Sequence, residues 1–107
     1  MHSTLLLDAI VQFYSGAFTG SFTKPIRASL WLPNTFSPTP AELHINQSIY
    51  AGEAYKLQIL VIAFPQLEAA LQPGVSILLG VFPTARAEGK IVAIEPYNEP
   101  PTRWLLA

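Results

Sequence analysis

The stretch from residue 72 to residue 94, QPGVSILLGVFPTARAEGKIVAI, decides the fold that we predict for this chain. It opens with a turn signal at Pro73 and Gly74, continues as an apolar run over residues 75–82, breaks at Pro83 and closes with a second run over residues 90–94. Two apolar runs joined by a short break that contains a proline are typical of an antiparallel β-hairpin. The stretch contains no residue pattern that points to a chemical reaction, so it indicates a fold and not a function.

Upstream of this hairpin, apolar and polar residues alternate with a period of two, which predicts further strands. The segments with this pattern are residues 4–14, 26–32, 42–45 and 54–64. In the last of them the second face begins polar and becomes apolar at Leu60 and Ile62. A strand that is apolar on both faces at one end is covered there, by another part of the chain or by a partner.

Loops and one helical turn connect these strands. Residues 15–21 carry two glycines, and residues 33–40 carry three prolines, so both segments are predicted to be loops. Residues 66–71 are predicted to form one helical turn that ends before Pro73. The fold class is therefore all-β, a single small closed antiparallel β-barrel of about six strands, because closure removes unpaired strand edges.

The chain divides into a predicted β-barrel domain, residues 1–94, and a proline-rich C-terminal tail, residues 95–107. The tail reads as an extended linker that ends in an apolar tip containing Trp104. We expect this tip to dock onto the barrel or onto a neighbouring molecule, because free termini are usually polar.

The composition favours a protein partner. Half of the 107 residues are hydrophobic and 12% are charged, against roughly 25% charged residues in an average domain. Some of this apolar surplus should lie on the surface, where contiguous patches mark interfaces. We therefore expect a protein partner or a homo-oligomer. The net charge of −1 and the scattering of six basic residues argue against a nucleic-acid-binding platform.

Other sequence features limit the cellular setting. The chain has no cysteine, so disulfides, zinc–thiolate sites and iron–sulfur clusters are excluded. The N-terminus lacks the basic segment of a signal peptide, and the longest apolar segment, residues 57–64, is far shorter than the roughly 20 residues of a spanning helix. A soluble, cytoplasmic protein without membrane contact is the expectation.

Two motifs resemble a known family. At Tyr50-Ala51-Gly52-Glu53, and again at Leu71-Gln72-Pro73-Gly74 with the hairpin that follows, the chain resembles the C-terminal β-barrel domain of translation elongation factor Tu and its freestanding small relatives. The resemblance extends from about Leu5 to Ile94 and includes the order of loops and strands. It implies a small closed barrel.

The chain departs from this family at the tip of the last hairpin. Family members commonly carry Arg-Glu-Gly-Gly-Arg there, whereas this chain has Gly80-Val81-Phe82-Pro83-Thr84. In the elongation factor the barrel contributes to contacts with aminoacyl-tRNA and with the GTPase domain. Because the glycine pair and its basic neighbours are replaced, the resemblance implies the fold more strongly than the function.

No catalytic, cofactor-binding or metal-ligating residue is predicted. The imidazoles are His2, near the terminus, and His44, which is expected on the polar face of its strand without a second ligand at a fixed offset. Solvated surface positions account for the acidic residues, which are Asp8, Glu42, Glu53, Glu68, Glu88, Glu95 and Glu99.

The aromatic residues offer the best candidates for a contact surface. Tyr14, Phe18, Phe22 and Trp31 would form an adhesive patch if exposed together, or would pack across the barrel. At the hairpin tip a phenylalanine is harder to bury within its own barrel. The predicted partner-binding residues are Phe82, Pro83, Thr84, Arg86 and Trp104.

These observations lead to two functional hypotheses. The first is a non-enzymatic protein-interaction module, which uses the hairpin tip at residues 82–86, an apolar outer face near Leu60 and Ile62, and the C-terminal tip. The second is a translation-associated RNA-binding or factor-binding protein, which the family resemblance implies. An enzyme ranks third, because no motif supports catalysis.

Overall fold

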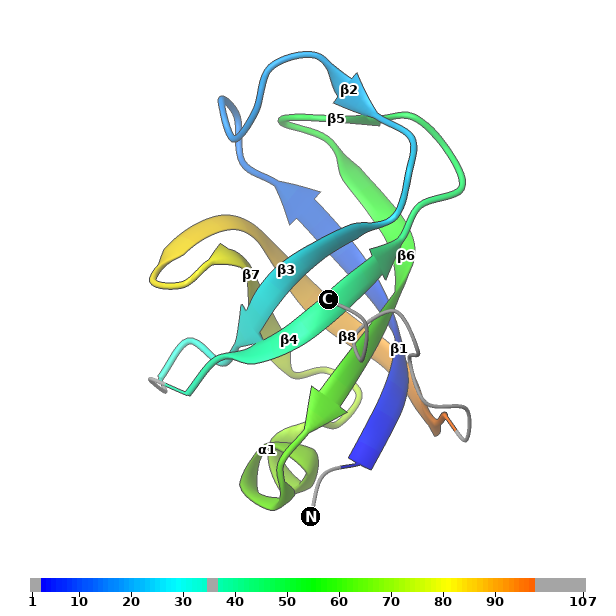
Figure 1. Cartoon of the computed structure of the whole chain (residues 1–107), viewed down its shortest axis with the longest axis vertical. Coiled ribbons are helices and arrows are strands. Elements are labelled where there is room, and N and C mark those ends of the chain that lie inside the picture. The colour runs from blue at the N-terminus through cyan, green and yellow to red at the C-terminus, as the bar shows by residue number, and fades with distance from the viewer. Residues whose placement is uncertain (1–2, 35–36, 98–107) are drawn as a thin grey trace.

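Six strands close into an antiparallel barrel in the computed structural model, which describes residues 3–34 and 37–97 (Figure 1). Every neighbouring pair in the barrel is antiparallel. The strands, in their order around the barrel, are β1 (Ser3–Phe13), β6 (Ala54–Ala63), β4 (Thr39–His44), β3 (Ile26–Trp31), β7 (Ser76–Val81) and β8 (Thr84–Pro96), which pairs again with β1. The prediction of a small closed all-β barrel is confirmed.

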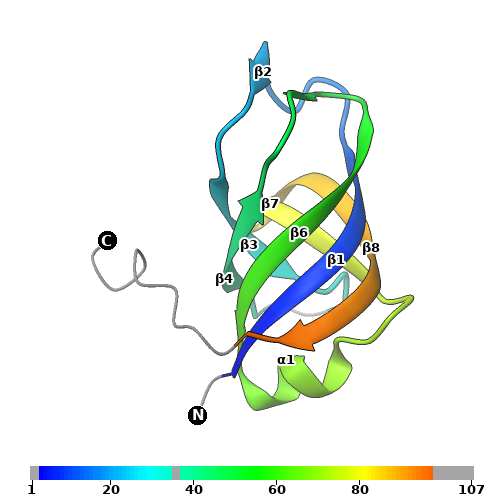
Figure 2. The same ribbon diagram turned by 90° about the vertical axis from the view of Figure 1, so that its right-hand side faces the viewer.

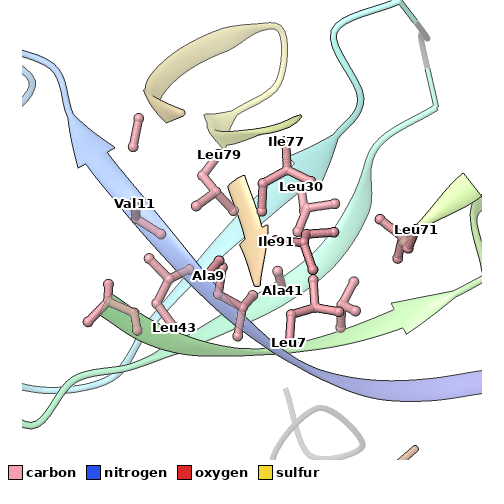
Figure 3. Packing of buried hydrophobic residues seen from close by; sticks show 14 of the residues in the cluster. Leu7, Ala9, Val11, Leu30, Ala41, Leu43, Leu71, Ile77, Leu79 and Ile91 are labelled. Carbon is pink, nitrogen blue, oxygen red and sulfur yellow. The ribbon is translucent and has the colours of Figure 1, made fainter. Parts of the chain in front are cut away.

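Side chains along the strands point alternately into and out of the barrel, and the inward-pointing ones form the core. In β1 the odd-numbered side chains from Leu5 to Phe13 are all buried, whereas Ile10 and Gln12 face outward. Figure 3 shows Leu7, Leu30 and Ile77, from three different strands, meeting inside the barrel. Each such side chain contributes roughly 1.5–3 kcal/mol when it is fully buried, so the barrel interior is the main source of stability.

Separate elements cover the two ends of the barrel (Figures 1 and 2). A short ribbon of β2 (Ser21–Phe22) and β5 (Ile49–Tyr50) lies at one end, and Ile49 is fully buried there. The helix α1 (Pro65–Ala70) lies at the other end and contributes Leu67 to the core. The helical turn is confirmed. The ribbon was not expected, because two-residue strands are too short to show alternation.

The strand β4 starts earlier than predicted. Residues 33–40 were expected to be loop throughout, yet Thr39 and Pro40 belong to β4, and Pro40 pairs with Ser29 of β3. The pairing of β4 with β6 begins only at Ala41. Pro40 therefore has a strand partner on one side, the edge-like position in which a residue without an N–H group is tolerated.

The barrel also ends later than predicted. β8 continues to Pro96, which pairs with Leu5, and the Tyr97 N–H donates to the Thr4 carbonyl at 2.9 Å. The barrel domain thus includes at least two residues assigned to the tail. Trp104 and the other residues of the predicted tail from 98 to 107 lie outside the described residues.

Two β-bulges interrupt β8. Asp8 pairs with Ala93 and Ala9 with Ile91, which leaves Val92 without a partner in β1. At the other end Leu79 pairs with Ala87 and Gly80 with Ala85, which leaves Arg86 without a partner in β7. The side chains of both bulged residues are exposed.

The helical content is small. α1 has 6 residues, and across residues 3–34 and 37–97 no helix has the length and apolar character that a membrane crossing demands.

Candidate interaction site at the mouth of the barrel

A seam in the barrel wall opens between β3 and the β7–β8 hairpin. β3 pairs with β4 along Ile26–Leu30, but with β7 only along Ser29–Trp31. The hairpin then turns through Phe82 and Pro83, which are joined by a cis peptide bond, and its tip projects from the side of the barrel in Figure 1. Residues 26–28 of β3 therefore have no paired residue in β7.

A cavity of about 240 Å³ lies at this seam. Its walls come from residues 26–28 of β3 and from Gly80, Val81 and Arg86 of the hairpin, and its floor comes from the end of β1 and the loop that follows. We call it the mouth cavity. Because residues distant in sequence line it, the cavity depends on closure of the whole barrel.

An aromatic cluster forms the floor of the mouth cavity, with Phe13 at its centre. The ring of Phe13 packs edge-on against Phe18, Phe22 and Tyr55, at centroid distances of 5.8, 5.9 and 6.1 Å. Phe18 and Phe22 lie 4.6 Å apart and are half-buried. Edge-to-face pairs in this distance range contribute about 0.5–1.5 kcal/mol beyond burial, so these contacts stabilise the floor.

Backbone hydrogen bonds hold Phe13 in place. Its N–H donates to the Glu53 carbonyl at 3.0 Å, and its carbonyl accepts from the Gly52 N–H at 3.1 Å. Gly52 has a φ of +86°, a conformation that glycine adopts without steric cost. The side-chain amide of Gln12 donates to the carbonyls of both Phe13 and Gly52 at 3.0 Å. The turn before β6 thus fixes the floor of the cavity.

The bulge at Arg86 ties the hairpin to the loop that carries Phe18. The Arg86 carbonyl accepts from the Tyr14 N–H at 3.0 Å, and its guanidinium Nη1 donates to the Ala17 carbonyl at 2.7 Å. Gly80 lies opposite the bulge, where a Cβ would stand 2.3 Å from the Thr84 carbonyl oxygen. Only glycine therefore fits at this position of the hairpin.

The lining of the mouth cavity is apolar apart from two arginines. Arg27 and Arg86 are the charged residues among those that line it, and no acidic residue belongs to the described lining. Val81 is 73% exposed at the rim, the largest value among the exposed large hydrophobic residues of the described chain. Beside the rim, burial raises the pKa of the Tyr14 hydroxyl, and the negative charge of Glu88 raises it further.

The predicted partner-binding residues separate in the structure. Arg86 lines the mouth cavity, and Pro83 and Thr84 are exposed at the tip. Phe82 was expected to be hard to bury, but it is half-buried and packs edge-on against Trp31 at 5.1 Å. The tip therefore exposes less aromatic surface than the sequence indicated. Trp104 lies outside the described residues.

The four aromatic residues considered for an adhesive patch do not form one group. Phe18 and Phe22 belong to the floor of the mouth cavity, whereas Trp31 is 4% exposed beneath Phe82. Tyr14 is half-buried near the Arg86 bulge. Sequence reasoning missed Phe13 and Val81, because a buried and an exposed apolar residue look alike in an alternating pattern.

The predicted apolar outer face is wrong in its location. Leu60 is 3% exposed and Ile62 is half-buried, so neither offers a large free surface. Instead, Ile10 and the bulged Val92 are exposed along a groove of about 530 Å³ on the outer side of β1, β7 and β8. We call it the outer groove. Glu88 and Lys90 line it as well, so its charge is mixed.

Glu42 and His44 form a contact between a carboxylate and an imidazole, the residue types that general acid–base catalysis uses. His44 Nε2 lies 3.1 Å from Glu42 Oε1 on the outer side of β4. The prediction that Glu42 is solvated is wrong, because this residue is 3% exposed. Among the described residues no group of three or more histidines or acids is placed to hold a metal ion. His2 lies outside that part of the chain.

Comparison with family models and with curated proteins finds no match. No protein-family model matches the chain, and none of the curated proteins resembles it at a significant level.

Proposed function

We propose that the protein is a non-enzymatic protein-interaction module on a barrel like that of elongation factor Tu, and that it binds a partner protein at the mouth cavity. The observation that carries this proposal is the position of Val81, 73% exposed beside an apolar cavity with an aromatic floor. A partner that covers this exposed apolar residue and the neighbouring cavity removes apolar surface from water, which is favourable for binding.

The chemistry of the rim supports the same proposal. Arginine and aromatic residues, phenylalanine among them, are enriched at protein interfaces, and the mouth cavity combines Arg86 with Phe18 and Phe22. The guanidinium of Arg86 is already positioned by the Ala17 carbonyl. A pre-positioned arginine loses less conformational entropy when a partner binds.

An RNA-binding role has weaker support. Strong phosphate-binding surfaces make about 6–10 phosphate contacts, whereas two arginines line the mouth cavity and the net charge of the chain is −1. Titration with tRNA at low salt tests this alternative. Binding that falls steeply with salt would favour it over a protein partner.

Photo-crosslinking tests the proposal directly. A benzophenone amino acid replaces Val81 in one variant and Val92 of the outer groove in the matched control, and each is irradiated in extract of the source cells. We expect a discrete adduct at position 81 that is missing at position 92. An adduct of twice the 11.7 kDa chain mass would identify a second copy as the partner.

Two results would contradict the proposal. One is the same adduct pattern at both positions, and the other is no adduct at position 81. A chain that light scattering shows to be monomeric, and that binds no apolar dye, would add to that evidence.

A further inference from the structure

We infer that the mouth cavity accepts one bulky apolar side chain from an extended, acidic peptide segment of the partner. This inference rests on the proposed function, because it specifies which kind of protein surface binds at the same site.

The size of the cavity favours a side chain over a small molecule. Cofactor and ligand sites usually occupy about 300–1,000 Å³, and the mouth cavity measures about 240 Å³. Phe13, Phe18 and Phe22 supply an aromatic floor onto which an aromatic or aliphatic side chain packs. The cavity is therefore suited to a single anchoring residue.

The strand pairing favours an extended peptide. Residues 26–28 of β3 pair with β4 on one side, and the ladder to β7 stops at Ser29. Across the seam, Val81 marks the end of β7 before the hairpin turns away. A peptide in β conformation laid along the seam directs every second side chain to the same face, so one of them enters the cavity.

The charges favour an acidic sequence around the anchor. Arg86 lines the cavity, and no acidic residue belongs to its described lining. Arg86 directs Nη1 to the Ala17 carbonyl, and a guanidinium carries five N–H donors in all. A carboxylate next to the anchoring residue can therefore accept a charge-assisted hydrogen bond from Arg86.

Fluorescence polarisation with defined peptides tests the inference. The probe is a short labelled peptide with one central phenylalanine flanked by aspartates. Two matched peptides replace the phenylalanine by alanine or the aspartates by lysines. We expect the acidic phenylalanine peptide to bind, and both replacements to weaken binding by about tenfold or more.

Variants of the protein connect this binding to the cavity. Val81→Asp and Arg86→Gln should each lower the affinity for the acidic peptide by about tenfold. The matched substitutions in the outer groove, Val92→Asp and Lys90→Gln, should leave this affinity unchanged. Unfolding curves establish that each variant is folded. Val81 is largely exposed, so Val81→Asp remains informative if Arg86→Gln lowers stability.

Several outcomes would overturn the inference. Equal binding of the lysine peptide, insensitivity to Val81→Asp, or failure of all peptides each contradicts it. Binding of free octanoate without any peptide would assign the cavity to a small molecule, and a dimer that Val81→Asp dissociates would assign it to a second copy. If crosslinking at position 81 persists while the peptides fail, the proposed function stands and only the peptide class is wrong.

Discussion

Gly80 shows how a single residue sets the geometry of the site. A Cβ on this residue would lie 2.3 Å from the Thr84 carbonyl oxygen and 2.9 Å from the Arg86 nitrogen, both of them backbone atoms. Gly80→Ala should therefore force the bulge apart and lower the free energy of unfolding by about 3 kcal/mol or more. Urea denaturation followed by circular dichroism measures this change.

Gly16 provides the comparison for that substitution. It has a φ of +79°, and a Cβ added there would meet no atom within 4 Å. Gly16→Ala should lower the free energy of unfolding by only about 1 kcal/mol, because the left-handed backbone conformation is its one source of strain. Equal losses of stability in the two variants would contradict the steric account of the bulge.

Tyr14 should make stability depend on pH in the alkaline range. Its pKa in the folded chain is raised from 10.0 by burial and by Glu88, so the folded state favours the neutral hydroxyl. This contribution is present below the unfolded pKa and is lost as the pH rises through the folded pKa. Tyr14→Phe should therefore lose less stability than the wild type between about pH 9 and about pH 11. Identical losses in urea denaturation would refute the assignment.

One side-chain hydrogen bond connects the short ribbon to β6. The Tyr50 N–H of β5 donates to the Tyr55 hydroxyl of β6 at 2.9 Å, which fastens the ribbon across the turn at Gly52. Tyr55→Phe should lower stability by about 1 kcal/mol and speed hydrogen exchange at the Tyr50 amide. Tyr50→Phe leaves this hydrogen bond in place and serves as the control. Unchanged exchange in Tyr55→Phe would be evidence against this role.

The length of an element decided how well the sequence predicted it. β1 and β6 have 11 and 10 residues, enough for alternation to identify both the strand and its buried face. β2 and β5 have 2 residues each, and their pairing depends on contacts between distant segments. The bulge at Arg86 has no local signal either, because it arises from the register of β7 against β8.

The candidate site was predicted only in part for the same reason. Arg86 and the hairpin were identified from the sequence, and Arg86 does line a cavity. The seam, however, exists because the ladder between β3 and β7 stops at Ser29, and nothing in either strand alone indicates where a ladder stops. Val81 is exposed beyond the end of that ladder, whereas Phe82 is half-buried against Trp31.

At the scale of the whole molecule, stability and binding should depend on different residues. Ile59 is fully buried in the barrel core, whereas Val81 is 73% exposed. Ile59→Ala should lower the free energy of unfolding by about 2–5 kcal/mol, and Val81→Asp should change it by about 0.5 kcal/mol or less. Urea denaturation of both variants measures the difference. A large loss in Val81→Asp would mean that this residue supports the barrel itself.

The proposed partner site lies where the barrel wall opens between β3 and the β7–β8 hairpin. Titration of the isotope-labelled chain with the acidic phenylalanine peptide, followed by nuclear magnetic resonance, tests it most directly. We expect the largest shifts on residues 26–28, on Val81 and Arg86, and on the rings of Phe18 and Phe22. Shifts centred on Ile10, Leu78 and Val92 would instead place the binding surface in the outer groove and contradict the proposed site.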